Sequence, residues 1–244
     1  MDTNQNAKRC VAIVLAAGTG KRMNSKTPKQ FMLLQDKPVV WYSLQVFEQT
    51  DMIDEIILVT GKDDIPYVKE QIVERFGFQK VSKIVSGGAQ RYDSVYQALE
   101  AMDDHSGFVF IHDGARPFLT SQILLDLKEA VECYQACVTA TRVKDTIKIA
   151  DENGFVSSTP NRDGLWSVQT PQVFSGELIW EAYQKLREQL PELTAKGIQV
   201  TDDAMVVEQM MSKKIRLVPG SYDNIKLTTP EDLTIAKSIL EKIL

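Results

Sequence analysis

The chain of 244 residues has 43% hydrophobic and 25% charged residues, which is the composition of an ordinary globular enzyme. Its 28 basic and 33 acidic residues leave a net charge of −5, which excludes a nucleic-acid binder that relies on a broad basic surface. No apolar run approaches the roughly 18 residues that a membrane-spanning helix needs, so no membrane partner is expected.

Residues 1–8 are polar and lack the charged-then-apolar pattern of a signal peptide, so we expect them to form a loose tail. Residues 9–244 are then expected to form a single domain. The three cysteines, Cys10, Cys133 and Cys137, are an odd number without a secretion signal. This favours reduced thiols and a cytoplasmic protein.

Apolar strand segments alternate with amphipathic helices over the first 141 residues. Continuous apolar strands separated by helices predict an α/β fold, with a mostly parallel twisted sheet and helices on both faces. The expected strands are 11–16, 55–60, 83–85, 108–112 and 137–141, and the expected helices are 39–49, 65–76, 91–102 and 121–134.

Residues 144–174 interrupt this alternation. Two extended runs flank Asn153 and Gly154, a strong hairpin signal, and a segment rich in turn residues follows. We interpret the stretch as a β-hairpin arm that leaves the main sheet. After it, helices are expected at 176–189 and 203–211, a strand at 214–218, and a last helix capped by Thr229 with Pro230 and Asp232 in its first turn.

The loop after the first strand, "AAGTGKRM", combines glycines with cations. It is not a Walker A loop, because Arg22 follows Gly20-Lys21, and not a dinucleotide fingerprint, because Met23 replaces the last glycine. Backbone N–H groups of such a loop can hold phosphates that Arg22 and Lys29 neutralise. The alternative is a plain strand-to-helix turn with solvated cations.

Further polar groups are expected beyond the carboxyl ends of the strands, where parallel sheets bind ligands. The loops concerned are 17–29, 86–91 and 113–117. Asp113 at a strand end suits Mg²⁺, which prefers oxygen ligands and phosphates, although a turn aspartate is the alternative. The other candidates, each with a structural or solvated alternative, are Gly88, Arg91, Ser94, Arg116, Arg162, Thr170 and Lys226.

Several blocks resemble the 2-C-methyl-D-erythritol 4-phosphate cytidylyltransferase family, in order from residue 11 to the C-terminus. They are "AAGTGKRM", "PKQF", "GGAQRYDSV", "HDGARP", "DTIK", "NRDGLWSVQTPQ", "TDDA" and "NIKLTTPEDL". Ribitol-5-phosphate cytidylyltransferase shares part of the pattern and is the alternative, but "RYDSV" and "HDGARP" favour the first family. Asn161 departs from the pattern, since many members carry aspartate before the arginine.

The resemblance implies a Rossmann-like nucleotidyltransferase fold and Mg²⁺-dependent transfer of CMP from CTP to a polyol phosphate. It assigns Arg22 and Lys29 to the transition state and Arg162 and Lys226 to the acceptor phosphate. CTP would be held by Ala16, Ala17, Gly18, Gly20, Gly88, Arg91 and Ser94, and the acceptor by Asp113, Arg116, Thr146, Thr170 and Thr201, with Asp113 also near the metal.

The resemblance also implies a homodimer in which the arm carries Arg162 into the partner's site. Two other classes stay open: a catalytically silent nucleotide-binding protein, and a nicotinamide-dependent dehydrogenase that the missing fingerprint glycine disfavours.

Overall fold

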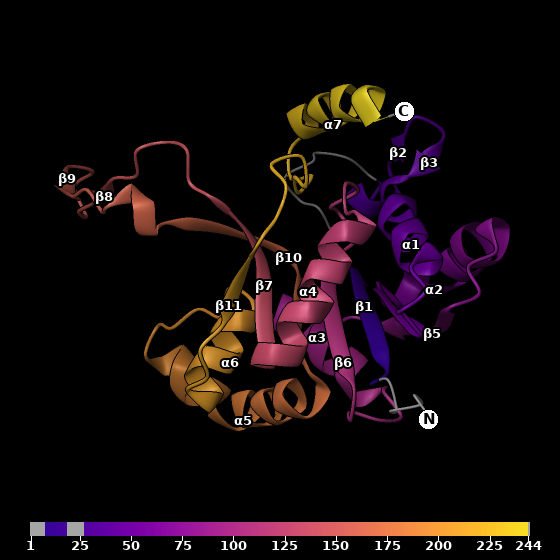
Figure 1. The fold of residues 1–244 in the computed structure, drawn as a ribbon, viewed down its shortest axis with the longest axis horizontal. Helices are drawn as coiled ribbons and strands as arrows, with labels where there is room; N and C mark the ends of the chain where they lie inside the picture. Colours follow the sequence, from indigo (N-terminus) through magenta and orange to yellow (C-terminus); the bar gives the residue numbers. More distant parts are fainter. Residues whose placement is uncertain (1–7, 19–26, 244) are drawn as a thin grey trace, which may run out of the picture.

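The structure, a computed structural model, describes residues 8–18 and 27–243. Its centre is a seven-stranded sheet in the order β11-β7-β10-β6-β1-β4-β5 (Figure 1). Neighbouring strands are parallel except β10, which runs antiparallel to both β6 and β7. The strands are β1 (Cys10–Ala16), β4 (Glu55–Thr60), β5 (Val81–Ser86), β6 (Phe108–Asp113), β7 (Ala136–Arg142), β10 (Trp166–Ser175) and β11 (Arg216–Pro219).

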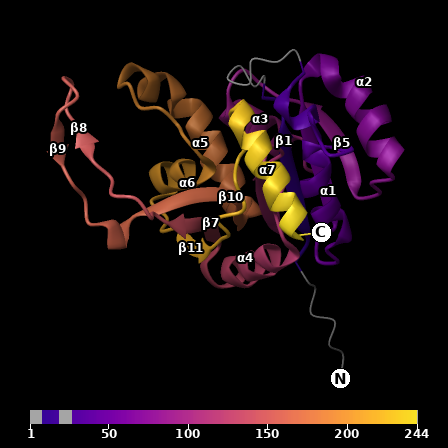
Figure 2. The same ribbon diagram turned by 90° about the horizontal axis from the view of Figure 1, so that it is seen from above.

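Helices cover both faces of this sheet, which confirms the predicted α/β class (Figure 2). The helices α1 (Val39–Gln49), α2 (Ile65–Val68) and α4 (Ser121–Tyr134) pack on one face. The helices α3 (Arg91–Glu100), α5 (Gly176–Ala195) and α6 (Asp203–Met211) pack on the other. Side chains of the central strands β1, β4 and β6 alternate between the two cores, so these strands are almost entirely apolar, as buried parallel strands are.

The last helix, α7 (Pro230–Ile243), packs outside these layers. It contributes Ala236, Ile239 and Leu240 to a smaller core with Leu34 and Phe118. The remaining elements are short: strands β2 (Leu33–Leu34) and β3 (Lys37–Pro38), 3-10 turns at Lys29–Phe31, Lys62–Asp64 and Arg162–Gly164, and a π-helical continuation of α2 at Lys69–Glu74. In the part of the chain that the structure describes, no helix is long and apolar enough to cross a membrane.

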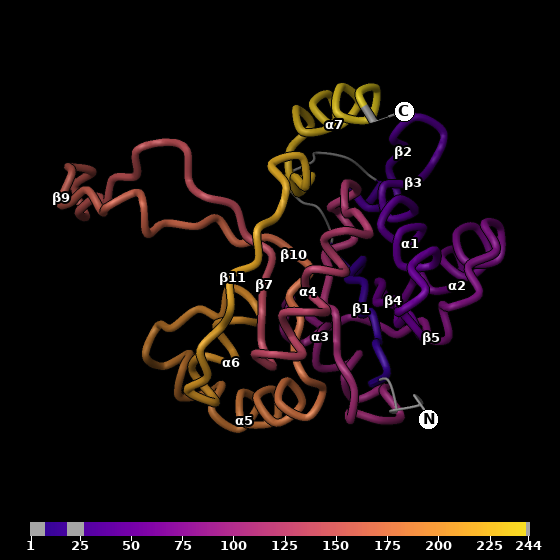
Figure 3. Tube along the Cα trace, in the orientation of Figure 1, coloured from indigo at the N-terminus to yellow at the C-terminus, as the bar shows by residue number. Residues whose placement is uncertain are grey.

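The predicted hairpin arm is present and projects from the body of the molecule (Figure 3). Its strands are β8 (Ile149–Ala150) and β9 (Val156–Ser158), which pair antiparallel. Gly154 takes a φ of +83° in the connecting turn, a conformation that side chains with a Cβ disfavour. The Asn153-Gly154 signal therefore located the turn correctly.

The main sheet holds one strand that the sequence analysis had placed in the excursion. Trp166–Ser175 is β10 and lies between β6 and β7, so the arm is shorter than the expected 144–174. Its polar residues and Pro171 hide the strand signal. A register shift between Val168 and Gln172 takes Pro171 out of the regular ladder with β7.

Helix α5 also runs beyond its expected end at residue 189, because it continues through Pro191 to Ala195. Proline removes one helical hydrogen bond, and the sequence pattern therefore predicted an earlier end. Leu193 beyond the proline is buried in the core with α6, and this packing supports the last turns.

Candidate active site

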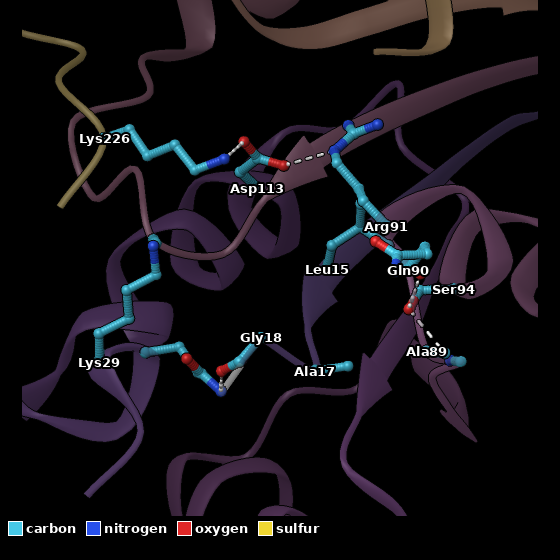
Figure 4. Close-up of a pocket in the computed structure, with 13 residues that line it drawn as sticks. Leu15, Ala17, Gly18, Lys29, Ala89, Gln90, Arg91, Ser94, Asp113 and Lys226 are labelled. Carbon is cyan, nitrogen blue, oxygen red and sulfur yellow. Dashed lines mark hydrogen bonds and ion pairs between the residues drawn. The ribbon is translucent and has the colours of Figure 1, made fainter. Parts of the chain in front are cut away.

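A cavity of about 290 Å³ opens beyond the carboxyl ends of β1 and β6. The loops after β1, β5 and β6 all line it, as the sequence analysis expected, and Lys226 from the segment before α7 joins them (Figure 4). The expected ligands Ala17, Gly18, Gly88 and Ser94 are all in its wall. Gly20 and Arg22 lie outside the described residues, so their expected roles stay predictions.

Gln30 links the start of the glycine loop to the segment that carries Lys29. It is buried, and its Nε2 donates to the carbonyl oxygens of Ala16 at 2.6 Å and Gly18 at 3.1 Å. Because Gln30 follows Lys29 in the 3-10 turn Lys29–Phe31, these bonds also fix the segment that carries Lys29. The sequence analysis had not singled out Gln30, although the "PKQF" block contains it.

The start of α3 forms the second wall, and its glycines allow the close approach. Gln90 and Asp93 form a capping box, and the N–H of Gly88 donates to Oγ of Ser94 at 3.1 Å. A Cβ on Gly88 would lie 2.3 Å from the Cβ of Asp93, and one on Gly87 would lie 2.4 Å from the Cβ of Ala17. A larger residue at Gly87 would push its loop away from the glycine loop, and one at Gly88 would push the loop away from the start of α3.

Asp113, at the end of β6, is the centre of the charge network. Lys226 and Arg91 reach it from opposite sides (Figure 4). The Nζ of Lys226 lies 2.7 Å from Oδ2, the Nε of Arg91 lies 3.2 Å from Oδ1, and the Nε of Arg116 lies 4.0 Å from Oδ2. Burial alone would raise the pKa of Asp113, but these cations outweigh it and hold the pKa well below its usual range.

The same network bears on the expected metal ligand. Both oxygens of Asp113 already face cations, and the described residues contain no group of three or more His, Cys, Asp or Glu that could hold a metal ion. Mg²⁺ in nucleotide enzymes is bound by one or two carboxylates together with substrate phosphates. The described part of the site therefore does not fit a resident metal centre.

Arg91 is held from behind by a buried acid that the sequence analysis missed. Its Nη1 and Nη2 donate to the two oxygens of Asp203, at 2.9 and 2.8 Å, and Asp203 is 0% exposed. The Tyr183 hydroxyl donates to the same carboxylate at 2.6 Å. Burial and the charge of Asp203 raise the pKa of Tyr183 well above its usual range, so this hydroxyl keeps its proton. The "TDDA" block was the signal that contained Asp203.

A second cavity of about 230 Å³ adjoins the first, and Arg91, Asp113 and Lys226 line both. Three further residues that were assigned to an acceptor from the sequence, Arg116, Thr170 and Thr201, line this second cavity and not the first. The wall shared by the two cavities is therefore a carboxylate between two cations.

A buried relay fixes the loop after β6 that carries Asp113 and Arg116. The Asp113 N–H donates to Oγ1 of Thr170 at 3.0 Å, the Thr170 hydroxyl donates to Nδ1 of His112 at 3.1 Å, and Nε2 of His112 donates to the Arg116 carbonyl at 3.2 Å. Burial lowers the pKa of His112 to about 4, so the ring is neutral, with its proton on Nε2 facing the carbonyl and with Nδ1 as the acceptor.

Lys226 is positioned by the segment before α7. The Leu227 N–H donates to the Ala115 carbonyl at 2.9 Å. Nη1 of Arg116 donates to the backbone carbonyl oxygen of Asn224 at 2.7 Å. Asp232 accepts the N–H groups of Thr228 and Thr229, as expected for one half of the predicted capping box. The start of α7 and the loop after β6 therefore hold each other in place.

Two expected site residues lie in the arm and line neither cavity of this chain. Thr146 is exposed, and Arg162 is exposed with its Nη1 donating to the Lys144 carbonyl at 2.9 Å. Asn161, the departure from the family pattern, caps the turn Arg162–Gly164 by accepting the Asp163 N–H. Asn161 therefore shapes the turn and makes no pair with Arg162.

Comparison with known proteins identifies the family. The model of the 2-C-methyl-D-erythritol 4-phosphate cytidylyltransferase family matches residues 10–242. A protein of that name from Lachnospira eligens is 50% identical over 94% of this chain and 98% of its own length. One from Alkaliphilus oremlandii is 46% identical over 97% of each chain.

Solved structures agree with this assignment. The crystal structure of 4-diphosphocytidyl-2C-methyl-D-erythritol synthase from Anaerococcus prevotii superposes with a TM-score of 0.80, at 34% identity over 96% of each chain. The 2-C-methyl-D-erythritol 4-phosphate cytidylyltransferase of Francisella tularensis gives a TM-score of 0.76, at 28% identity over 94% of this chain and 99% of that one. The chain therefore belongs to the 2-C-methyl-D-erythritol 4-phosphate cytidylyltransferase family.

Proposed function

We propose that the protein transfers CMP from CTP to 2-C-methyl-D-erythritol 4-phosphate, giving 4-diphosphocytidyl-2-C-methyl-D-erythritol and pyrophosphate, in the non-mevalonate route to isoprenoids. The observation that carries this proposal is the pair of adjoining cavities in a chain of this family. One cavity is large enough for part of a nucleotide, and the other holds charged groups suited to a polyol phosphate. Their shared wall is where the two phosphates would meet.

In this reaction an oxygen of the acceptor phosphate attacks the α-phosphorus of CTP, and the bond to the pyrophosphate breaks. The acceptor phosphate is already ionised at neutral pH, so no general base is required. The protein must bring two anions together and stabilise the charge that moves to the leaving group. Lys29 in the first cavity and Lys226 at the shared wall suit this work, and Arg22 is expected to join them.

The nucleotide would bind with its base and ribose against Ala16, Ala17, Gly18, Gly88 and Ser94. Most of these residues offer only backbone groups, which give a fixed pattern of donors and acceptors. A site with such fixed partners rejects an analogue that leaves them unpaired. We therefore propose a preference for CTP over UTP and a stronger one over the purine nucleotides.

The contacts of Arg91 favour a supporting role over direct contact with CTP. Because its guanidinium donates to Asp113 and Asp203, it supports the wall of both cavities. The proposed contact of Arg91 with CTP would have to use the face of the guanidinium or exchange one of these bonds.

The acceptor would bind in the second cavity, among Asp113, Arg116, Thr170 and Thr201, with its phosphate towards Lys226. Thr146 and Arg162 belong to this proposal through a homodimer, in which the partner's arm reaches the cavity. The support is that the arm projects from the body with exposed apolar side chains, including Ile149 at 51% and Phe155 at 72%. Two arms related by a two-fold axis would cover such surfaces through a self-complementary interface.

The triphosphate would bring Mg²⁺ with it, since a divalent cation neutralises phosphate oxygens in such reactions. The expected contact of Asp113 with this ion requires the metal to exchange places with a cation that now pairs with the carboxylate. We place the protein in the cytoplasm, which the three free cysteines support.

A pyrophosphate-release assay tests the proposed function. CTP and Mg²⁺ are supplied with 2-C-methyl-D-erythritol 4-phosphate, with ribitol 5-phosphate, or with no acceptor. Release with the methylerythritol phosphate, and little with the others, is the expected result. Faster release with ribitol 5-phosphate would move the protein to the alternative acceptor, and release without acceptor would indicate a hydrolase.

A further inference from the structure

The second cavity contains one side chain made only of hydrocarbon, that of Val168. The other described residues that line it, from Asp113 and Lys226 to Thr201 and Asp202, are charged or carry hydrogen-bonding groups. Val168 is 39% exposed, whereas its neighbours Gln169 and Thr170 are buried. Val168 is therefore the one wholly hydrocarbon side chain that the described lining offers to a ligand in this cavity.

The local backbone explains how Val168 comes to lie there. It pairs with Ala140 of β7 at the last regular position of β10 before the register shift that ends at Gln172. Beyond it, Gln169 donates to the Ser221 carbonyl and Thr170 accepts from Asp113, so both turn inwards. Val168 therefore lies on a strand that these hydrogen bonds anchor next to it.

We propose that Val168 selects the acceptor by packing against its methyl branch. This inference rests on the proposed function and deepens it. The phosphate and hydroxyl groups of a methyl-branched polyol phosphate require polar partners, which the cavity offers at Arg116, Thr170 and Lys226. Its single methyl group requires apolar surface, because leaving it in water or against a charge forfeits the gain of burial. Among the described lining residues, Val168 supplies that surface.

The selectivity from one such contact is limited and measurable. A methyl group in an apolar pocket changes kcat/KM by about 10- to 200-fold, and the partial exposure of Val168 puts its effect near the lower end. Selection should therefore appear as a preference of about tenfold for the branched acceptor over the same polyol phosphate without its methyl.

The experiment compares 2-C-methyl-D-erythritol 4-phosphate with D-erythritol 4-phosphate, which lacks only the branch methyl. Kcat/KM for both is measured in the wild type, in Val168→Thr and in Val168→Ala. Threonine keeps the branched shape but replaces one methyl by a hydroxyl, and alanine removes both. We expect the preference to fall from about tenfold to below about threefold in both variants. The kcat/KM with erythritol 4-phosphate should fall less than the kcat/KM with the branched acceptor, since erythritol 4-phosphate has no methyl contact to lose.

Ile198→Thr is the matched control, because Ile198 is 37% exposed and lines neither cavity. It should keep the wild-type preference. An unchanged preference in the Val168 variants, or an equal loss with both acceptors, would overturn the inference while leaving the proposed function in place. A changed molar mass with an unchanged preference would instead assign Val168 to a subunit contact. Failure of the wild type to use either acceptor would contradict the proposed function itself.

Discussion

At the scale of single residues, the charged side chains behind the active site form buried ion pairs. Each charge in such a pair depends on its partner to offset the cost of burial. Arg91 is the clearest case, because it joins the buried Asp203 to Asp113 at the wall between the cavities. Removing one partner of a buried ion pair leaves a charge without compensation, which costs more than the pair itself contributes. The residues behind the site are therefore as sensitive as those that line it.

Asp203→Asn tests this dependence. We expect it to lower the free energy of unfolding by about 3 kcal/mol, because Arg91 then keeps only Asp113 as a full counter-charge. The free energy of unfolding is measured by urea denaturation for this variant and for Asp202→Asn. Asp202→Asn is the matched control, because asparagine can still cap α6 by accepting the Met205 N–H. Equal losses in the two variants would show that the Arg91–Asp203 pair has no special weight.

His112 makes the stability depend on pH. Its pKa is lowered to about 4 by burial, against 6.5 for an unburied histidine, so protons bind the unfolded chain first as the pH falls. The contribution of neutral His112 to the free energy of unfolding is complete above pH 6.5 and is lost progressively towards pH 4. Between pH 7 and pH 5 this lowers the free energy of unfolding by about 2 kcal/mol. Urea unfolding over this range measures it. In His112→Gln the decline should be smaller by that amount, and an unchanged decline would mean that other groups cause it.

At the scale of elements, the sequence correctly predicted those helices, strands and turns that hydrophobic periodicity and turn residues determine. Strand β4 and helices α1, α4 and α6 have the bounds that the pattern predicted, and the Asn153-Gly154 turn forms the arm. Strand β10 escaped prediction because three of its buried residues are polar: Gln169, Thr170 and Gln172 form hydrogen bonds across the site that local sequence does not reveal.

The same reason limits what could be predicted about the site. The three loops and most of their ligating residues follow from strand order, since carboxyl ends of parallel strands meet at one edge. Asp203 and Tyr183 could not be found in that way, because their role depends on α5 and α6 packing behind α3. Contacts between elements distant in the sequence are fixed by the fold and leave no local pattern.

Gly88→Ala tests the contact between the loop after β5 and the start of α3. The added Cβ would lie 2.3 Å from that of Asp93, so the loop or the capping box must shift. We expect a rise of about tenfold in KM for CTP, with a smaller change in KM for the acceptor, because only the first cavity includes Gly88. Gly164→Ala, where nothing lies within 4 Å, is the control. Equal effects on both substrates would contradict this assignment.

At the scale of the whole molecule, the arm is the feature that the single chain does not explain. It extends from the body of the molecule (Figure 2) and has exposed apolar side chains, and its Arg162 lines neither cavity of its own chain. Exchange of arms between two subunits would account for both facts. An isolated two-stranded hairpin is only marginally stable in water, so a partner would also stabilise the arm itself.

Subunit mixing tests this exchange. Arg162→Ala and Lys29→Ala should each lose about 10²- to 10³-fold in kcat, because each removes a charge from the proposed transition state. Mixed dimers with swapped arms would contain one intact site and one site with both defects. Random equal mixing should therefore restore about a quarter of the wild-type activity, as half of the dimers are mixed and one of two sites in each is intact. If mass spectrometry shows exchange and no activity returns, Arg162 acts within its own subunit.

³¹P NMR of the reaction mixture identifies most directly the bond that the protein makes. With CTP, Mg²⁺ and 2-C-methyl-D-erythritol 4-phosphate, we expect one new bridging diphosphate and pyrophosphate to appear together in equal amounts, while the signals of both reactants decline. Formation of CDP with orthophosphate, pyrophosphate without the bridging diphosphate, or a bridged product from ribitol 5-phosphate alone would contradict the proposed reaction.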